Sequence, residues 1–364
     1  MLIVHVLHEI MFGGVGAVAL NLITQQEKNG LRTAVVSHPD DEAAFLSLAQ
    51  ARGLSTRFYP IERFRLSRPT LWGELSGRNL RRIAADFPGE QIILHLHNPI
   101  AAGLFSHLQR PMLLSIHTLM NVTGRLPRFL YLTALRRVHR RGGKLVGVSH
   151  AVAEDFMDKL HVDDVAHVLN GVEDLPAASG GHVPNNGRIH IGFASNLNEL
   201  KGWKYLAEGF LALPDSLRAR ADLTLAGRVD PGDQPYLDSL LAANPDIRYA
   251  GYLPDARTSL VPDLDILLLP SRTEAQGMIL LEAMQSRVAV CATAVGGIPE
   301  VVIHGETGLI IRRDAADIAE KLSLLISDEA LRHRLAENGR KLYERKGSAE
   351  AMCQNYLEIY QSLL

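Results

Sequence analysis

The sequence contains little cysteine and no long apolar run. Its 364 residues include two cysteines, Cys291 and Cys353, each within an expected regular element. This excludes a disulfide framework and a cysteine-based metal site and favours a reducing compartment. No apolar run approaches the roughly 18 residues of a membrane span. The first residues, Met1–Phe12, are apolar but include two histidines and a glutamate and no basic leader, so we expect a buried strand, no signal peptide and a cytoplasmic location.

Charge of either sign is not in excess. The formal net charge is −2, which gives no indication of a nucleic-acid partner, and we expect none. Residues 57–144 nevertheless carry fifteen Lys or Arg against four Asp or Glu. The arginines cluster at Arg63, Arg65 and Arg68, at Arg78, Arg81 and Arg82, and at Arg125, Arg128, Arg136, Arg137, Arg140 and Arg141. A solvated helix face explains many such clusters, but an excess confined to one half also favours an anionic membrane surface or a phosphate-bearing substrate.

Short apolar runs alternate with helical patterns along the whole chain. The runs that we predict as strands are Leu2–Leu7, Thr33–Ser37, Gln91–His97, Met112–His117 and Lys144–Val148 in the first half, and Ile189–Ala194, Leu223–Ala226, Ile266–Leu269 and Val288–Thr293 in the second. Several are apolar throughout, as strands covered on both faces are. This alternation predicts an α/β fold with parallel sheets and right-handed crossovers.

The length and a break in composition predict two domains. A chain of 364 residues is too long for one ordinary core. The segment Pro176–Gly187 is rich in Gly, Pro, Asn and Ser, as linkers are. We predict an N-terminal domain at 1–172, a linker at 173–187, a C-terminal domain at 188–346 and a last helical segment at 347–364. Two doubly wound domains would bind a ligand at the carboxyl ends of their strands.

A glycine-rich turn, Gly13–Gly16, follows the first predicted strand and opens a helix. Backbone amides in such a turn can approach an anion closely. A dinucleotide site would also need an acidic residue about 20 positions later, at the end of the second strand. That strand ends at Val36–Pro39, which contains no acid. The pattern disfavours an NAD-dependent oxidoreductase and leaves an anion-binding loop or a tight turn that merely needs glycine.

Histidines end two predicted strands of the first half. His95 and His97 close one strand, and His117 closes another. Active sites of α/β proteins form at strand carboxyl ends, where a histidine can bind a hydroxyl or phosphate or move a proton. The alternatives are histidines bonded to neighbouring backbone and a three-histidine zinc set. We rank zinc last, because adjacent strand ends gather such residues without a metal.

Two segments of the second half can bind a phosphorylated sugar. Lys201 lies in a strand-to-helix turn, where it would face a diphosphate or simply be a surface lysine. The stronger segment is Pro270–Ala283, in which Glu274 precedes a helix opened by Gly277, and Glu282 follows eight positions after Glu274. The first amides of that helix can hold phosphate. Carboxylates suit sugar hydroxyls, and Glu282, among apolar neighbours, needs a hydrogen-bonding partner.

Together these motifs resemble the GT-B glycosyltransferases, specifically the large retaining group called family 4, over nearly the whole chain. The resemblance is carried by the order and spacing of Gly13–Gly16, His97, Ile116-His117, Val148-Ser149 with Phe156, Asn170–Val172, Lys201-Gly202, Gly227, Gly251-Tyr252, Pro270-Ser271, Glu274 with Gly277, Glu282-Ala283, Gly296–Glu300 and Gly305–Gly308. It implies two Rossmann-like, doubly wound domains that face each other across a cleft. It also implies that the last helix, roughly Ala349–Leu364, crosses back to the N-terminal domain.

The resemblance implies roles for individual residues. In a C-terminal donor-binding domain, Lys201 would neutralise the leaving nucleotide, Glu274 would lie near the donor sugar, and Glu282 would hold the ribose. His117, the third catalytic residue beside Lys201 and Glu274, would contact the sugar or help to position the acceptor. The other expected donor ligands are Gly14, Gly16, Asn196, Arg228, Gly277, Met278 and Ile279, and the expected acceptor ligands of the N-terminal domain are His97, Arg125 and Arg128.

We expect no metal and no cofactor, because a lysine and a helix N-terminus can meet the charge on the leaving diphosphate. Asp263 and Asp265 form the DxD pair that chelates metal in a different glycosyltransferase architecture, but here they open a predicted buried strand and are better explained as turn residues. One departure concerns phosphate binding. Relatives usually have an arginine where this chain has Ser195-Asn196, and Arg228 or Arg272 is the predicted substitute.

The predicted activity is a retaining, metal-independent transfer of a hexosyl group from a UDP- or GDP-type nucleotide-sugar to a glycan or lipid-linked acceptor. The predicted setting is the biosynthesis of a surface polysaccharide, lipopolysaccharide or glycolipid. The basic region 57–144 favours a peripheral position on the inner face of the cytoplasmic membrane. The alternatives are a nucleotide-sugar epimerase or soluble glucoside synthase of the same fold, and a catalytically silent sugar-binding protein.

Overall fold

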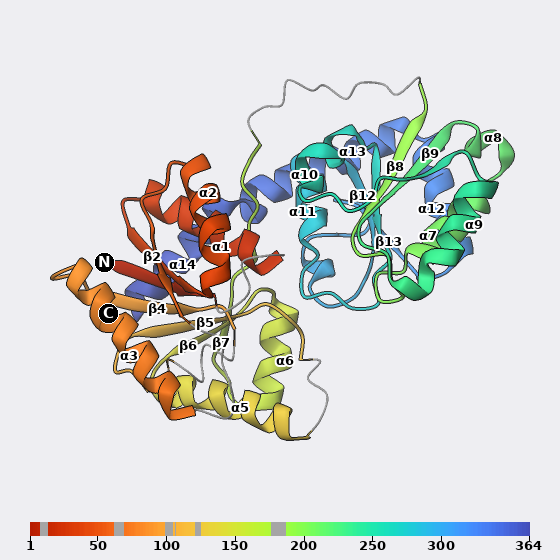
Figure 1. The fold of residues 1–364 in the computed structure, drawn as a ribbon. Helices are drawn as coiled ribbons and strands as arrows, with labels where there is room; N and C mark the ends of the chain where they lie inside the picture. Colours follow the sequence, from red (N-terminus) through yellow and green to blue (C-terminus); the bar gives the residue numbers. More distant parts are fainter. Residues whose placement is uncertain (8–13, 62–68, 99–104, 106, 121–124, 176–186) are drawn as a thin grey trace. The chain divides into compact units, whose positions relative to one another are not determined.

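The computed structural model describes residues 1–7, 14–61, 69–98, 105, 107–120, 125–175 and 187–364, and only the backbone of residues 69–75 and 125–127. The chain forms two compact units, one of Met1–Glu173 with Ser348–Leu364 and the other of Asp174–Gly347. Each unit is a parallel sheet flanked by helices (Figure 1). The predicted α/β fold of two doubly wound domains is therefore confirmed. Gly13, most of the predicted linker, and Arg63, Arg65 and Arg68 lie outside the described residues.

The first unit contains a seven-stranded sheet in the order β3-β2-β1-β4-β5-β6-β7. Its strands are β1 (Leu2–Val6), β2 (Arg32–Ser37), β3 (Arg57–Pro60), β4 (Ile92–Leu96), β5 (Met112–Ile116), β6 (Lys144–Gly147) and β7 (Val165–His167), and its helices are α1 (Gly14–Lys28), α2 (Glu42–Ala51), α3 (Pro69–Asp86), α5 (Arg125–Arg140), α6 (His150–Leu160) and α14 (Ala349–Ser362). Every residue of β1, β4 and β5 is buried. The strand order reverses between β1 and β4, where doubly wound sheets bind ligands.

The second unit contains a six-stranded parallel sheet in the order β10-β9-β8-β11-β12-β13. Its strands are β8 (Ile189–Ala194), β9 (Ala221–Ala226), β10 (Ile247–Tyr249), β11 (Ile266–Leu269), β12 (Ala289–Thr293) and β13 (Leu309–Ile311), and its helices are α7 (Trp203–Leu211), α8 (Asp215–Arg218), α9 (Gln234–Ala243), α10 (Ala256–Ser259), α11 (Met278–Gln285), α12 (Ala315–Ser327) and α13 (Glu329–Leu342). Trp203 and Phe210 of α7 are fully buried in its core. Here the strand order reverses between β8 and β11.

The C-terminal helix α14 belongs to the first unit, although it follows the second in the chain. It packs against α1, and in Figure 1 the two helices lie side by side. A short parallel bridge joins Val172 to Ser348, and the Ser348 hydroxyl accepts a hydrogen bond from the Ala351 amide as the helix begins. The buried face of α14 carries Tyr356 and Tyr360 into the first unit.

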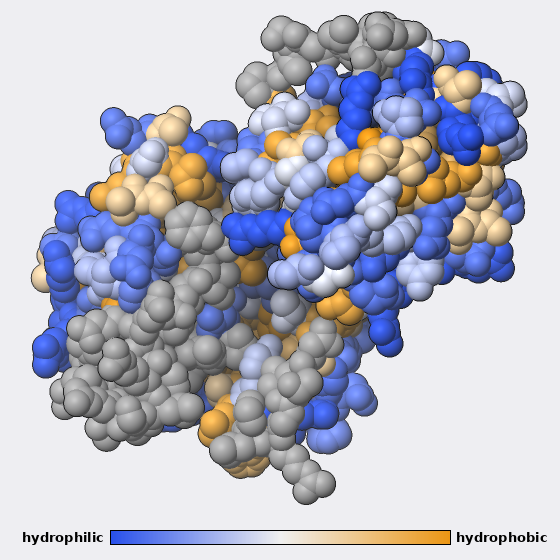
Figure 2. Space-filling model, turned by 45° about the vertical axis from the view of Figure 1, so that its right-hand side comes forward, coloured by the Kyte–Doolittle hydropathy of each residue, from blue (hydrophilic) through white to orange (hydrophobic). Residues whose placement is uncertain are grey.

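On the face drawn in Figure 2, hydrophilic residues predominate and hydrophobic ones form separate patches, as on globular proteins in general. Cys291 in β12 and Cys353 in α14 are buried and free. In the described part of the chain, no helix is both long enough and apolar enough to cross a bilayer.

Candidate functional site

Two loops meet at the switch point of the second unit. One connects β8 to α7 and contains Lys201, and the other connects β11 to α11 and contains Glu274. Gly202 allows the loops to approach each other. Its φ is +72°, and a Cβ atom there would lie 2.1 Å from the carbonyl oxygen of Pro270. Any other residue would force the loops apart, so glycine holds them in contact.

Lys201 and Glu274 contact each other directly. Lys201 Nζ lies 2.5 Å from Glu274 Oε1, and the Ser271 hydroxyl donates to the same oxygen at 2.8 Å. Thr293 at the end of β12 donates to the Ser271 carbonyl at 2.6 Å and fixes that residue in turn. The Lys201 backbone amide donates to the Asn198 side chain at 3.1 Å. The two predicted catalytic residues of this unit thus form one hydrogen-bonded group.

Helix α11 begins beside this group, immediately after Gly277. The amides of Met278 and Ile279 lie in its first turn, where no intrahelical acceptor exists and an anion can bind. Glu282 lies one turn further on and is partly buried. Burial raises the pKa of Glu282 to about 7, while Arg257 lowers it and Asp255 raises it further. The carboxyl group is therefore poised to change its charge near neutral pH.

The residues considered as phosphate ligands lie around the ends of β8 and β9. Gly227 has a φ of +141°, and a Cβ atom there would lie 1.8 Å from the Ser195 carbonyl oxygen, so the two strand ends touch. The exposed Arg228 follows, with its guanidinium 4.4 Å from the ring centre of Tyr252. Asn196 and Arg272 are exposed on neighbouring loops. Arg228 is therefore held in place by a cation–π contact while its charge stays available to solvent.

In the first unit, histidines line the ends of the central strands. His97 Nδ1 lies 3.2 Å from His117 Nε2, and His97 Nε2 lies 2.9 Å from His5 Nδ1. His95, two residues before His97 in the chain, stacks on the His97 ring with ring centres 4.1 Å apart. Burial lowers the pKa of His5 and of His117 to about 4 and holds the pKa values of His95 and His97 well below their usual range. All four rings are neutral at pH 7.

The zinc alternative can be compared with this geometry. Among the described residues, the three histidines whose nitrogens come within 4.8 Å of one another are His5, His95 and His97, in place of the set with His117 considered from the sequence. Each of their six ring nitrogens lies within hydrogen-bond distance of another protein group. A metal would have to displace several of these bonds, so the donor set fits a hydrogen-bond network better than a zinc site.

The remaining predicted residues are scattered over the two units. Gly14 and Gly16 lie in the first turns of α1, Gly14 exposed and Gly16 buried. Arg128 is exposed on α5, and the Arg125 side chain lies outside the described residues. Asp265 accepts a hydrogen bond from the His190 amide at 2.8 Å, between β8 and the start of β11. This is the structural role expected for a turn acid.

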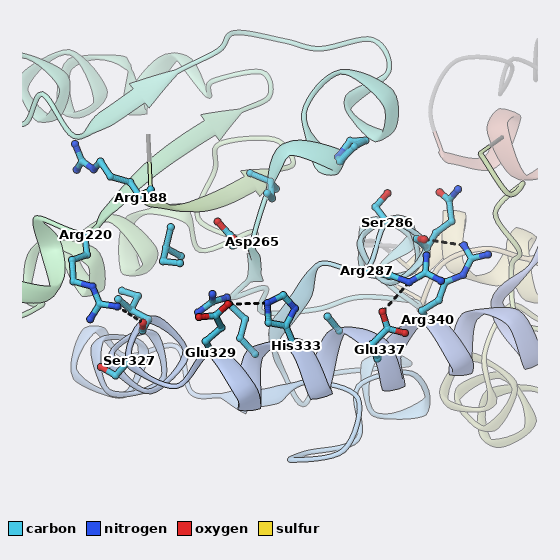
Figure 3. A pocket seen from close by; sticks show the side chains of 18 of the residues that line it. Arg188, Arg220, Asp265, Ser286, Arg287, Ser327, Glu329, His333, Glu337 and Arg340 are labelled. Atoms are coloured by element: carbon cyan, nitrogen blue, oxygen red, sulfur yellow. Dashed lines mark hydrogen bonds and ion pairs between the residues drawn. The ribbon is translucent and has the colours of Figure 1, made fainter. Parts of the chain in front are cut away.

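A hollow in the second unit lies at the amino-terminal ends of its strands, whereas the loops with Lys201 and Glu274 follow the carboxyl ends (Figure 3). Arg188, Asp265 and Arg287, which line it, come just before β8, β11 and β12, so it faces the amino-terminal ends of the strands. Several of its charges are paired. Arg287 binds Glu337 at 2.9 Å, and Arg340 binds Asp174 at 2.7 Å. Ligand sites of doubly wound sheets form at the carboxyl ends, so we do not assign the donor site here.

Sequence reasoning missed several residues that the structure brings into these groups. Thr293 supports Glu274 through Ser271, and the buried side chains of Gln26 and Tyr360 bind the histidines. The available signal was a polar residue in an otherwise apolar strand or helix face. His5 satisfies that criterion, since it interrupts the apolar strand Leu2–Val6.

Comparisons with known proteins identify the class. Residues 12–174 match the family described as Glycosyltransferase Family 4, and residues 177–342 match Glycosyl transferases group 1. A solved structure of HepE from Anabaena, in complex with UDP and glucose, superposes with a TM-score of 0.76 at 17% identity and covers 100% of both chains. The chain therefore belongs to the group 1 glycosyltransferases of the GT-B fold, family 4.

Two relatives illustrate the range within this family. The capsular polysaccharide biosynthesis glycosyltransferase CapM of Staphylococcus aureus is 29% identical over 185 residues, which are 49% of this chain and 47% of CapM. The chain thus spans about half the length of that relative. The N-acetyl-alpha-D-glucosaminyl L-malate synthase of Bacillus anthracis is 25% identical over 301 residues, which are 75% of each protein. The two differ in product, so similarity alone does not assign a substrate.

Proposed function

We propose that this protein transfers a hexosyl group, with retention of configuration and without a metal, from a UDP- or GDP-type nucleotide-sugar to a glycan or lipid-linked acceptor. The observation that carries the proposal is the Lys201–Glu274 pair beside the open N-terminus of α11. It combines a cation, a carboxylate and free backbone amides, which a diphosphate-linked sugar requires. HepE, of the same fold, was solved with UDP and glucose, and CapM is named for capsular polysaccharide biosynthesis, which supports a similar donor and setting here.

The reaction breaks the bond between the anomeric carbon and the diphosphate. Negative charge develops on the leaving oxygen, where Lys201 and the amides of Met278 and Ile279 stabilise it. Glu274 forms an ion pair with Lys201 in the donor-free protein and accepts hydrogen bonds from sugar hydroxyls when the donor binds. Glu282 accepts bonds from the ribose, and Asn196 and Arg228 complete the phosphate contacts. We further propose Gly14 and Gly16 as donor ligands and His117 as a ligand of a sugar or acceptor hydroxyl. The acceptor then attacks the anomeric carbon from the side of the leaving diphosphate, without a covalent intermediate, and the configuration at that carbon is retained.

A thermal-shift panel of UDP, GDP, ADP and their sugars tests the donor site. A ligand that binds only the native state raises the melting temperature by mass action. At a concentration 100 times Kd, it adds about 2.7 kcal/mol to the free energy of unfolding. We expect one nucleotide class to raise Tm and its sugar to release free nucleotide when an acceptor is supplied. No shift with any nucleotide would refute the donor site, and a shift without nucleotide release would favour the silent sugar-binding alternative.

Donor binding should depend on pH through Glu282. Its pKa is raised to about 7, so the carboxylate that accepts two ribose hydrogen bonds is formed above pH 7 and is lost as the pH falls. At pH 6, about a tenth of the group is ionised, and the affinity for a nucleotide-sugar should be up to tenfold lower than at pH 8. Isothermal titration at both pH values measures this. The variant Glu282→Gln should bind weakly with no such pH dependence, and an unchanged dependence would exclude Glu282 as its source.

We also propose a peripheral position on the inner face of the cytoplasmic membrane, through the basic region 57–144. Helix α5 supports this proposal with both apolar and basic side chains. Phe129 is 61% exposed and Leu130 is 45% exposed, and Arg128 and Arg137 are exposed on the same helix. Arg125 and Arg128 would then bind a phosphate of a lipid-linked acceptor. The predicted third ligand, His97, does not join them, because it is buried and both of its ring nitrogens are bonded, to His5 and to His117. Basic residues beside exposed apolar ones suit an anionic lipid surface.

Liposome flotation at low salt tests this membrane contact. Leu130→Ser should reduce partition onto vesicles that contain anionic lipid by about tenfold, since burying one leucine contributes about 1.5–3 kcal/mol. Leu324→Ser is the matched control, because Leu324 is 42% exposed on α12 of the other unit. Its partition should equal that of the wild type. Equal partition of the wild type onto neutral and anionic vesicles would remove the proposal.

A further inference from the structure

The first unit contains a continuous row of buried hydrogen-bonding side chains that ends at His117. From His117 inward, its members are His97, His5, Gln26, Tyr360, His95, Ser115 and Tyr356. His117 is partly exposed, whereas the others have exposed fractions of 0–3%. The fold assembles the row from distant segments. Strands β1 and β4 place His5 opposite His95 in register, and α14 supplies Tyr356 and Tyr360.

Gln26 stands in the middle of this row and has two different ends. Its side-chain oxygen lies 2.8 Å from His5 Nε2, and its side-chain nitrogen donates to the Tyr360 hydroxyl at 3.0 Å. Tyr360 also lies 2.6 Å from His95 Nδ1, so its hydroxyl can accept from Gln26 and donate to His95. The Gln26 amide thus separates two parts of the row. The histidine arm contains His5, His97 and His117, and the tyrosine arm contains Tyr360, His95, Ser115 and Tyr356.

The orientation of the amide determines the tautomers of the histidine arm. An amide oxygen only accepts, so His5 donates from Nε2 and, as a neutral ring, must accept at Nδ1. The partner of that nitrogen, 2.9 Å away, is His97 Nε2, which must therefore carry a proton. His97 then accepts at Nδ1, and its partner 3.2 Å away is His117 Nε2, which must donate. Every bond of the arm runs in one direction, from His117 toward Gln26.

We propose that this row of hydrogen bonds fixes His117 as the neutral tautomer protonated at Nε2, so that its Nδ1 is an unprotonated hydrogen-bond acceptor for a hydroxyl of the sugar or the acceptor. Gln26 and Tyr360 are then positioning residues, which act on the substrate only through His117. This inference rests on the proposed function for the role of His117, but the tautomer itself is a property of the free protein.

The surroundings keep the row neutral. Gln26, Ser115, Tyr356 and Tyr360 carry no charge at pH 7, and burial lowers the pKa of His5 to about 4. A neutral ring presents one donor and one acceptor, whereas a protonated one presents two donors. Turning the Gln26 amide by half a turn would reverse every bond of the arm and place the proton of His117 on Nδ1. The two directions therefore make opposite predictions for one nitrogen atom.

Nitrogen-15 NMR of histidine-labelled protein without substrate tests the direction. Long-range proton–nitrogen correlations distinguish a protonated ring nitrogen from an unprotonated one, and the His117 signals are assigned by their loss in His117→Gln. We expect Nε2 to be protonated and Nδ1 unprotonated at pH 7.5. A proton on Nδ1, a doubly protonated ring, or stoichiometric zinc in the purified protein would overturn the proposal.

Substitution of Gln26 tests the positioning role. In Gln26→Met, His5 Nε2 faces an apolar group, and an unpaired buried N–H is costlier than an unpaired acceptor, so the arm should reverse in at least half of the molecules. Turnover should fall at least twofold, in proportion to the fraction of His117 that keeps the Nε2 proton. Gln25→Met is the control on the neighbouring, partly buried position of α1 and should change neither readout.

A second pair of variants covers the case in which Gln26→Met does not fold. Tyr360→Phe removes the hydroxyl that holds the Gln26 amide nitrogen, so a mixture of His117 tautomers should appear. Tyr356→Phe is the control. Tyr356 is equally buried on α14 but lies at the far end of the row, so this variant should leave the His117 tautomer unchanged. Identical His117 spectra for both variants would overturn the role of Tyr360. A tautomer that moves without a change in turnover would overturn positioning. Absence of sugar transfer in the wild type would refute the proposed function alone.

Discussion

Replacing Lys201 with alanine should lower kcat by about 10²–10³-fold, the loss seen when one group that stabilises developing negative charge is removed. Lys201 Nζ lies 2.5 Å from Glu274, which belongs to the loop that leads into the first turn of α11. Its attraction to the diphosphate grows as the sugar leaves. We therefore expect kcat to fall more than KM rises in steady-state kinetics.

Lys204 provides the matched control for this experiment. It lies three residues further on and binds Asp233 at 2.6 Å, an ion pair as short and as partly exposed as that of Lys201. Lys204→Ala should keep near-normal kcat, and Lys201→Arg should restore part of the activity because it restores the charge. Melting temperatures separate misfolding from lost chemistry. Equal kcat values for Lys201→Ala and Lys204→Ala would show that Lys201 does not act on the leaving group.

The sheets were predictable from sequence where their strands are central. Ile189–Ala194 and Ile266–Leu269 have the bounds expected from their apolar runs, since both faces of each are covered. The edge strands β3, β7, β10 and β13 were not predicted. Each has three or four residues, too few to establish a periodicity, and β7 buries only its first residue. Pairing with a neighbouring strand makes them strands, and the local sequence does not show that pairing.

The two groups of candidate residues, one in each unit, differ in the same way. Lys201, Glu274 and α11 come from two loops whose glycines and acids form local patterns, so the sequence pointed to them. The hydrogen-bonded row in the first unit joins Gln26 to Tyr360 across 334 positions of the chain. No local spacing connects these residues, and each alone reads as an ordinary polar side chain. Only the register of β1 with β4 and the return of α14 to the first unit bring them together.

The buried histidines have a consequence for stability that can be given a sign. The pKa of His5 falls from 6.5 in the unfolded chain to about 4 in the folded protein because the ring is buried. Above pH 6.5 neither state binds the proton, so the stability does not depend on this group. Between pH 6.5 and pH 4 only the unfolded state binds it, so the free energy of unfolding falls as the pH falls. His95, His97 and His117 shift in the same direction and add to the effect.

Urea unfolding at a series of pH values should therefore show a stability that falls steeply below pH 6.5, because the four histidines outnumber Glu282, whose raised pKa acts in the opposite direction. His5 alone should contribute a loss of about 2 kcal/mol at pH 5, since a difference of one pKa unit corresponds to about 1.4 kcal/mol. His5→Phe should be less stable than the wild type at pH 7.5, because the Gln26 side-chain oxygen and His97 Nε2 lose their bonds to His5. Its slope should nevertheless be shallower by about one proton. His333→Phe, on the exposed surface of α13, should keep the wild-type slope. A slope unchanged in His5→Phe would mean that His5 is not held neutral, and the row that ends at His117 would then carry a charge.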